Sequence, residues 1–159
     1  MTFDPERYTS ADAIRSPRLK WLRSYWLSKT PVSGGLPPRA ALDPVEMKPV
    51  LSRVMVIEVV AKRFRYRLVG TEVAATAGYD FTGHFLDEQD FANRDFYLGC
   101  YRDIVTSKQP VFGLDHWAYP DGRSGVAEFM MLPLTLDGTT VGQILTIEDR
   151  LAAPAPGAP

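Results

Sequence analysis

Hydrophobic residues recur at helical spacing near the beginning of the chain. Ser16-Pro17 is a typical N-cap followed by proline at the first helical position. Leu19, Leu22 and Trp26 then recur every three or four residues, and Pro31 ends the pattern. The spacing predicts an amphipathic helix of about 13 residues.

Further along, the pattern changes from helical spacing to alternation. Residues 54–60 are mostly β-branched, and Phe64, Tyr66 and Leu68 alternate with three arginines. This alternation predicts two strands with one buried and one solvated face, joined at Lys62 as a hairpin. The arginines then belong to the solvated face.

The second half of the chain predicts two helices followed by three strands. Residues 70–78 favour a short helix that ends at a glycine, and residues 96–107 a longer amphipathic helix. Strands are expected at 111–119, 126–136 and 140–148, separated by Pro-Asp-Gly and Asp-Gly turns. The order is therefore helix, two strands, short helices, a longer helix and three strands.

Composition places the chain among globular proteins. Its 159 residues are 45% hydrophobic, and the net charge is −1. A nearly neutral chain argues against nucleic-acid or anionic-membrane partners, which clustered cations would bind. There is one cysteine, no apolar leader and no run long enough for a membrane helix, so we expect a cytoplasmic protein.

Three segments are expected along the chain. Residues 1–52 form an N-terminal helical cap and a Pro-rich connector, and residues 53–150 form the core. Residues 151–159, rich in Pro, Ala and Gly, are expected to be a disordered tail because they can bury little apolar surface.

The element order and several short motifs resemble the PAS domain family. Gly78-Tyr79, Gly83 and Leu86 fit the family's short-helix region, and Leu132-Pro133-Leu134 with Val141-Gly142 fits its ending. A Trp-containing helix and the sequence LPPRAALDP resemble a subgroup of small stand-alone bacterial PAS proteins. The resemblance implies an α+β fold, with a five-stranded antiparallel sheet, short helices on one face and an N-terminal amphipathic helix. It also implies a cavity and a role in signal transduction.

Strand parity within this fold nominates a candidate pocket. Residues 111–119 stay ambiguous, because either Phe112, Leu114 and His116 or Gly113, Asp115 and Trp117 could face inward, and a one-residue slip exchanges the two sets. Gln143 is a polar amide among apolar neighbours where PAS domains often contact a ligand. The candidate ligand-binding residues are Tyr66, Leu68, Tyr101, Val105, Trp117, Phe129, Met131, Gln143 and Leu145. A filled core that binds partners without a ligand is the close alternative.

The chain carries no recognisable cofactor or metal motif. Cys100 lies among apolar residues and resembles no flavin-photoreceptor motif, so we interpret it as a small buried hydrophobe. His84 and His116 lack metal-ligand spacing, and the predicted long helix has no histidine for haem. No haem or flavin motif is seen, no metal site is expected, and the cofactor is left unknown.

These observations favour a non-enzymatic PAS sensor or adaptor that binds a small ligand, a signalling protein, or both. The alternative is a small enzyme, such as a lyase or isomerase, on an α+β cone-like scaffold with Asp115 as its strand carboxylate. The aromatic N-terminal helix predicts a homodimer, unless it simply covers the core. The candidate interface residues are Leu19, Trp21, Leu22, Tyr25 and Trp26.

Overall fold

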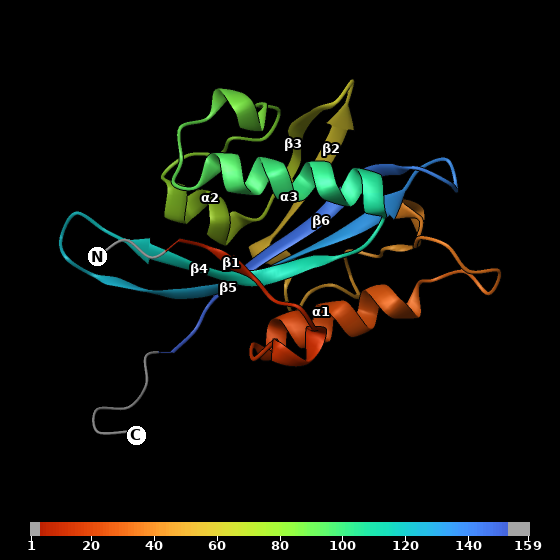
Figure 1. The fold of residues 1–159 in the computed structure, drawn as a ribbon, viewed down its shortest axis with the longest axis horizontal. Helices are drawn as coiled ribbons and strands as arrows, with labels where there is room; N and C mark the ends of the chain where they lie inside the picture. Colours follow the sequence, from red (N-terminus) through yellow and green to blue (C-terminus); the bar gives the residue numbers. More distant parts are fainter. Residues whose placement is uncertain (1–3, 153–159) are drawn as a thin grey trace.

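A six-stranded antiparallel sheet runs through the centre of the molecule in a computed structural model that describes residues 4–152 (Figure 1). The strand order across the sheet is β1-β4-β5-β6-β2-β3. The strands are β1 (Glu6–Arg7), β2 (Val54–Val60), β3 (Arg63–Val69), β4 (Val111–Ala118), β5 (Ser124–Thr135) and β6 (Val141–Arg150).

Helices lie on both faces of this sheet (Figure 1). One face carries α1 (Pro17–Ser28), and the other carries α2 (Thr71–Ala77) and α3 (Arg94–Ser107). Ser16 caps α1 by accepting a hydrogen bond from the Leu19 amide, as its sequence predicts. Gly78 ends α2 in the left-handed conformation, also as predicted. The predicted α+β fold and element order are confirmed.

Strand β1 was not predicted from the sequence, and it makes the sheet six-stranded instead of five-stranded. This short strand pairs with the outer edge of β4, where Arg7 lies opposite Gly113. A side chain at Gly113 would collide with the β1 backbone at Glu6, so the glycine permits the close approach. Two residues carry too little periodicity to be recognised as a strand.

The sheet separates two hydrophobic cores. The α1 face packs Leu19, Leu22 and Trp26 against Met130 and Leu132 of β5. The opposite face gathers aromatic and aliphatic side chains under α3. Alternate residues of β5 and β6 serve the two cores, so both strands are buried along most of their length.

Two register shifts overturn the expected parity at Leu68 and Gln143. In the β2–β3 pair, Tyr66 lies opposite Ile57 and Leu68 opposite Val56, which leaves Arg67 as an extra residue. In the β5–β6 pair, Gly142 is the corresponding extra residue. Each inserted residue reverses the alternation beyond it, which simple counting along a strand cannot anticipate.

Two of the three aromatic residues of α1 are buried within one chain, which reduces the surface that motivated the homodimer. Tyr25 and Trp26 are buried against the sheet, and the Trp26 indole donates a hydrogen bond to the Pro133 carbonyl at 2.9 Å. Trp21 stacks on Tyr25 and is partly buried. Leu19 and Leu22 are fully buried in the same core.

The predicted boundary after residue 52 and the predicted tail stay predictions. Residues before that boundary share the α1-side core with the sheet, so cap and core are packed as one body. Of the predicted tail, Leu151 still donates a backbone hydrogen bond to Val126. Residues 153–159 lie outside the described part of the chain.

Candidate ligand-binding site

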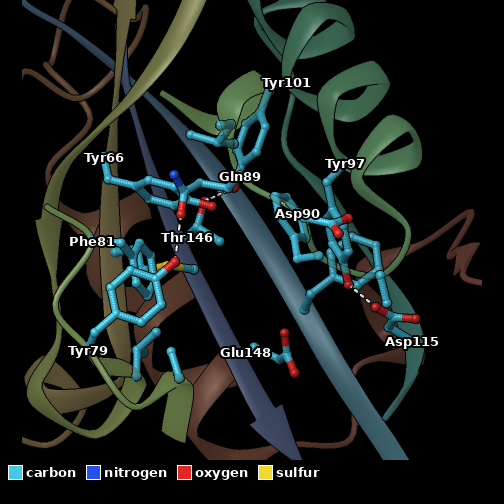
Figure 2. A pocket seen from close by; sticks show the side chains of 17 residues that line it. Tyr66, Tyr79, Phe81, Gln89, Asp90, Tyr97, Tyr101, Asp115, Thr146 and Glu148 are labelled. Carbon is cyan, nitrogen blue, oxygen red and sulfur yellow. Dashed lines mark hydrogen bonds between the residues drawn. The ribbon is translucent and has the colours of Figure 1, made fainter. Parts of the chain in front are cut away.

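A cavity of about 420 Å³ lies between the sheet, α2, α3 and the segment that joins these two helices (Figure 2). Its mouth is bordered by exposed residues such as Tyr79 and Asp90, so it opens to solvent. Most of its wall is apolar or aromatic. The lining residues are Met55, Tyr66, Val73, Ala77, Tyr79, Phe81, Leu86, Gln89, Asp90, Phe91, Ala92, Tyr97, Tyr101, Asp115, Phe129, Thr146 and Glu148.

Three of the predicted pocket residues lie together in this wall. Tyr66 comes from β3, Tyr101 from α3 and Phe129 from β5. All three are buried. Tyr66 meets the edge of Phe81, with ring centroids 4.6 Å apart. The strand parity that placed Phe129 on the α3 side is therefore correct.

The other predicted pocket residues lie outside the cavity wall. Met131 and Val105 pack in the core on the α3 side, away from the lining. Trp117 lies on the cavity face of β4 but beyond the lining, with Arg150 stacked 4.1 Å above its ring. Met131 and Trp117 do not line this cavity, because parity fixes a face of the sheet but no position along it, and Val105 lies four residues beyond Tyr101 on α3.

Leu68, Gln143 and Leu145 were assigned to the wrong face. Leu145 is buried in the α1-side core, and Leu68 packs against that core. Gln143 precedes Leu145 by two residues on β6 and lies on the same face, opposite Leu134 of β5. Its buried Oε1 has no hydrogen-bond partner among the described residues. The extra residues in β3 and β6 account for the error.

The structure shows which side chains of β4 face inward, because Asp115 is buried and lines the cavity. Its carboxylate accepts hydrogen bonds from the Tyr97 hydroxyl, from the Asn93 amide at 2.9 Å and from the His116 backbone amide at 2.7 Å. Three donors therefore hold this charge near the start of α3, and Figure 2 shows the one from Tyr97.

Two further hydrogen bonds fix polar groups in the wall. The Tyr101 and Thr146 hydroxyls are 3.0 Å apart, joining α3 to β6. At the mouth, the Tyr79 hydroxyl donates to Gln89 Oε1 at 2.6 Å. Burial raises the pKa of Tyr66 above its usual range, so its phenol stays protonated. It is a hydroxyl that a bound molecule could contact.

Glu148 of β6 differs from these groups because no described residue donates a hydrogen bond to its carboxylate. Its carboxylate points into the cavity and forms no hydrogen bond or ion pair with any residue between 4 and 152 (Figure 2). Water reaches it through the cavity, although protein atoms surround it on most sides. Desolvation, with Asp115 nearby, raises the pKa of Glu148 to about 7.

Within residues 4–152, no three His, Cys, Asp or Glu side chains group as a metal site would require. Cys100 is buried on α3, and desolvation raises the pKa of its thiol, which fits its interpretation as a small hydrophobe. In the same part of the chain, each helix lacks the length and the apolar run that crossing a bilayer requires.

Neither Glu148 nor the segment between α2 and α3 that lines the cavity was predicted from the sequence as part of the site. Glu148 occupies the same face as Ile144 and Thr146, four and two residues earlier, so its face could have been counted from Thr146. The joining segment shows no helical or strand periodicity in its hydrophobic residues. Its sequence therefore does not indicate which residues Phe81 or Gln89 contacts.

Comparison with known proteins identifies a family. A family model described as a PAS domain matches residues 14–147. No curated protein matches the chain.

Several solved structures are loosely similar. The PAS domain of a protein from Colwellia psychrerythraea is 14% identical, covering 69% of this chain and 98% of that one, with a TM-score of 0.46. The light state of the blue-light photoreceptor Aureochrome1 LOV is 8% identical, covering 67% and 87%, with a TM-score of 0.48. An RNA-binding Light-Oxygen-Voltage receptor is 18% identical, covering 76% and 36%, also at 0.48. At these values the likenesses carry no argument about ligands or partners.

Proposed function

Because the chain belongs to the PAS domain family, we propose that it is a sensor module that binds a small molecule in the cavity between α3 and the sheet. The observation that carries this proposal is the cavity itself. Its volume of about 420 Å³ lies within the range of roughly 300–1,000 Å³ found for small-molecule sites. An apolar wall with a few converging polar groups is also typical of such sites.

The position of the cavity supports a signalling role. Its wall includes the segment from Tyr79 to Ala92, which has little regular structure and joins α2 to α3. A ligand held between this segment and the sheet would order the segment at binding, because both sides contact it. We propose that this ordering is what a protein partner reads, in a bacterial and cytoplasmic setting.

The test is binding of a neutral apolar dye, N-phenyl-1-naphthylamine, to the full chain. We expect its fluorescence to rise on binding to the wild type. In Ala77→Phe a ring from α2 fills the cavity, so the signal should be lost. Ala75→Phe is the matched control, because Ala75 is exposed on the same helix and outside the lining.

Two outcomes would contradict ligand binding at this site. An equal signal in Ala77→Phe would place the dye elsewhere on the protein. No signal in the wild type, together with no small molecule released from denatured protein in mass spectrometry, would favour the partner-binding alternative without a ligand.

The homodimer stays a prediction from the N-terminal aromatic residues, although α1 uses them in its own core. Light scattering on the full chain at micromolar concentration tests it. A monomer would remove self-association from the proposal and leave the ligand site untouched.

A small enzyme is the second candidate, and one observation favours it. Asp115 and Glu148 line the same cavity, and a carboxyl with a pKa of about 7 suits general acid–base chemistry. Asp115 is less suited, because three donors already occupy its carboxylate. Turnover of a bound compound that disappears in Glu148→Gln would favour the enzyme over the sensor.

A further inference from the structure

The charged groups in the cavity wall all have one sign. Three carboxylates line it, those of Asp90, Asp115 and Glu148, and the lining residues include no lysine, arginine or histidine. Asp115 is satisfied by its own donors, whereas Glu148 has none. A concave site whose charges share one sign attracts ligands of the opposite sign.

No group around Glu148 forms a direct ion pair with its carboxylate among residues 4–152. Asp115 of β4 adds negative charge nearby, and the facing phenols of Tyr97 and Tyr101 on α3 are protonated because burial raises the pKa of each. The neighbouring cation is Arg150, which attracts Glu148 at a distance but stacks on Trp117 and donates to another group, the Tyr119 hydroxyl at 2.6 Å.

Aromatic side chains make up much of the remaining wall. Tyr66 and Phe81 form an edge-to-face pair, and Tyr97 meets Phe129 with ring centroids 5.4 Å apart. In Figure 2 the labelled rings stand on opposite sides of the space above Glu148. Aromatic faces attract cations as well as flat apolar bodies, so they complement the carboxylate.

We propose that the ligand is an organic cation, a protonated amine on an aromatic body, whose ammonium group binds Glu148 while its ring lies among the aromatic side chains. This inference rests on the proposed function, since it names the ligand class of the same cavity. It gives Glu148 the charge-assisted partner that the protein itself does not supply.

The test compares three indole compounds that differ in the charge of one group: tryptamine, neutral tryptophol and anionic indole-3-propionate. Calorimetric titration of the full chain should give tryptamine an affinity at least about tenfold above that of tryptophol. Indole-3-propionate should bind most weakly, because it places a carboxylate beside Glu148 and Asp115.

Variants assign this preference to Glu148. Glu148→Gln should remove the preference for tryptamine over tryptophol while tryptophol affinity stays within about twofold. Glu72→Gln is the matched control, because it makes the same change outside the lining, at an exposed carboxylate that is paired with Arg53. Should Glu148→Gln fail to fold, Asp90→Asn at the exposed mouth should still lower the preference by about twofold.

The pH dependence supplies a second readout. An alkyl ammonium group titrates near pH 10, whereas the pKa of Glu148 is raised to about 7. Tryptamine affinity should therefore rise from pH 6 to pH 8 as Glu148 ionises, with proton release on binding at the lower pH. Tryptophol affinity should stay flat over this range.

The outcomes separate this inference from the proposed function. Equal affinities for tryptamine and tryptophol would overturn the cation assignment and leave ligand binding intact. Dye binding without any tryptamine binding would do the same. If neither the dye nor any of the three indoles binds, both proposals are overturned.

Discussion

Glu128 and Glu148 lie on opposite faces of the sheet, and they differ in burial and in hydrogen-bond partners. On the α1 side, fully buried Glu128 accepts from the backbone amides of Ser16 at 2.6 Å and Arg15 at 3.0 Å, and from the Tyr8 hydroxyl at 2.7 Å. On the α3 side, Glu148 has no such partner among the described residues.

Adjacent residues of β6 make the same contrast. Asp149 faces α1, where it accepts from the Ser16 hydroxyl at 2.7 Å and forms an ion pair with Arg18 at 3.1 Å. Glu148, one residue earlier, faces the cavity. Satisfied carboxylates fasten the N-terminal segment to the sheet, whereas an unsatisfied carboxylate beside an open cavity is available for binding. The comparison assigns a structural role to Glu128 and Asp149, and it supports the binding role proposed for Glu148.

Removing the anchor should have the largest effect on stability. Glu128→Ala leaves the Arg15 and Ser16 amides and the Tyr8 hydroxyl without their acceptor, so we expect a loss of about 3–5 kcal/mol in the free energy of unfolding. Urea unfolding measures it. Glu148→Ala is the matched control and should not destabilise the protein at pH 8. Equal losses in the two variants would contradict the contrast between the faces.

Adjacent residues of β5 test the packing of the two faces. Met130→Ala removes a fully buried side chain from the filled α1-side core and should cost about 2–5 kcal/mol. Phe129→Ala truncates a larger ring that already borders the cavity, so we expect about 2 kcal/mol. Chemical denaturation compares them. A loss of about 5 kcal/mol in Phe129→Ala would indicate a filled core on both faces.

The titration of Glu148 should have a smaller effect with a defined sign. Its pKa is raised from 4.5 to about 7 in the folded chain, so its contribution is fully present below pH 4.5 and is lost as pH rises through 7. Glu148→Gln should therefore be more stable than the wild type at pH 8 and lose that advantage by pH 5. Because water screens the exposed carboxylate, we expect about 1 kcal/mol, or roughly 2–4 °C in Tm. An advantage that does not change with pH would contradict it.

The smallest effect is expected from the C-terminal end. Removing residues 152–159, rich in Pro, Ala and Gly, should leave Tm unchanged, because their side chains have little apolar surface to bury. Differential scanning calorimetry on the full and shortened chains measures it. A loss of several degrees would mean that this segment contributes to the packed structure.

Most of the fold followed from local patterns. The cap at Ser16, the left-handed Gly78 and the Asp-Gly turn after β5 each depend on a few neighbouring residues, so the elements they bound were predictable. The face of the sheet on which Phe129 lies could also be predicted, because the register of β5 is unbroken around this residue. Three residues of the cavity wall could be named on that basis.

The rest depended on contacts between distant segments. Arg67 and Gly142 each insert one residue into a strand pair, and a shift of register is decided by the partner strand. Likewise, the sequence could not show that the aromatic side chains of α1 pack against the sheet of the same chain.

The sequence by itself determined the element order, the family and the carboxylates at positions 128, 148 and 149. Only the tertiary structure decided their roles. Alternation in β6 sends Glu148 and Asp149 to opposite faces, and the donors of residues 15–18 reach Glu128 and Asp149 on the α1 side. A carboxylate becomes an anchor or an open binding group according to which donors reach it, and those donors come from residues more than a hundred positions away.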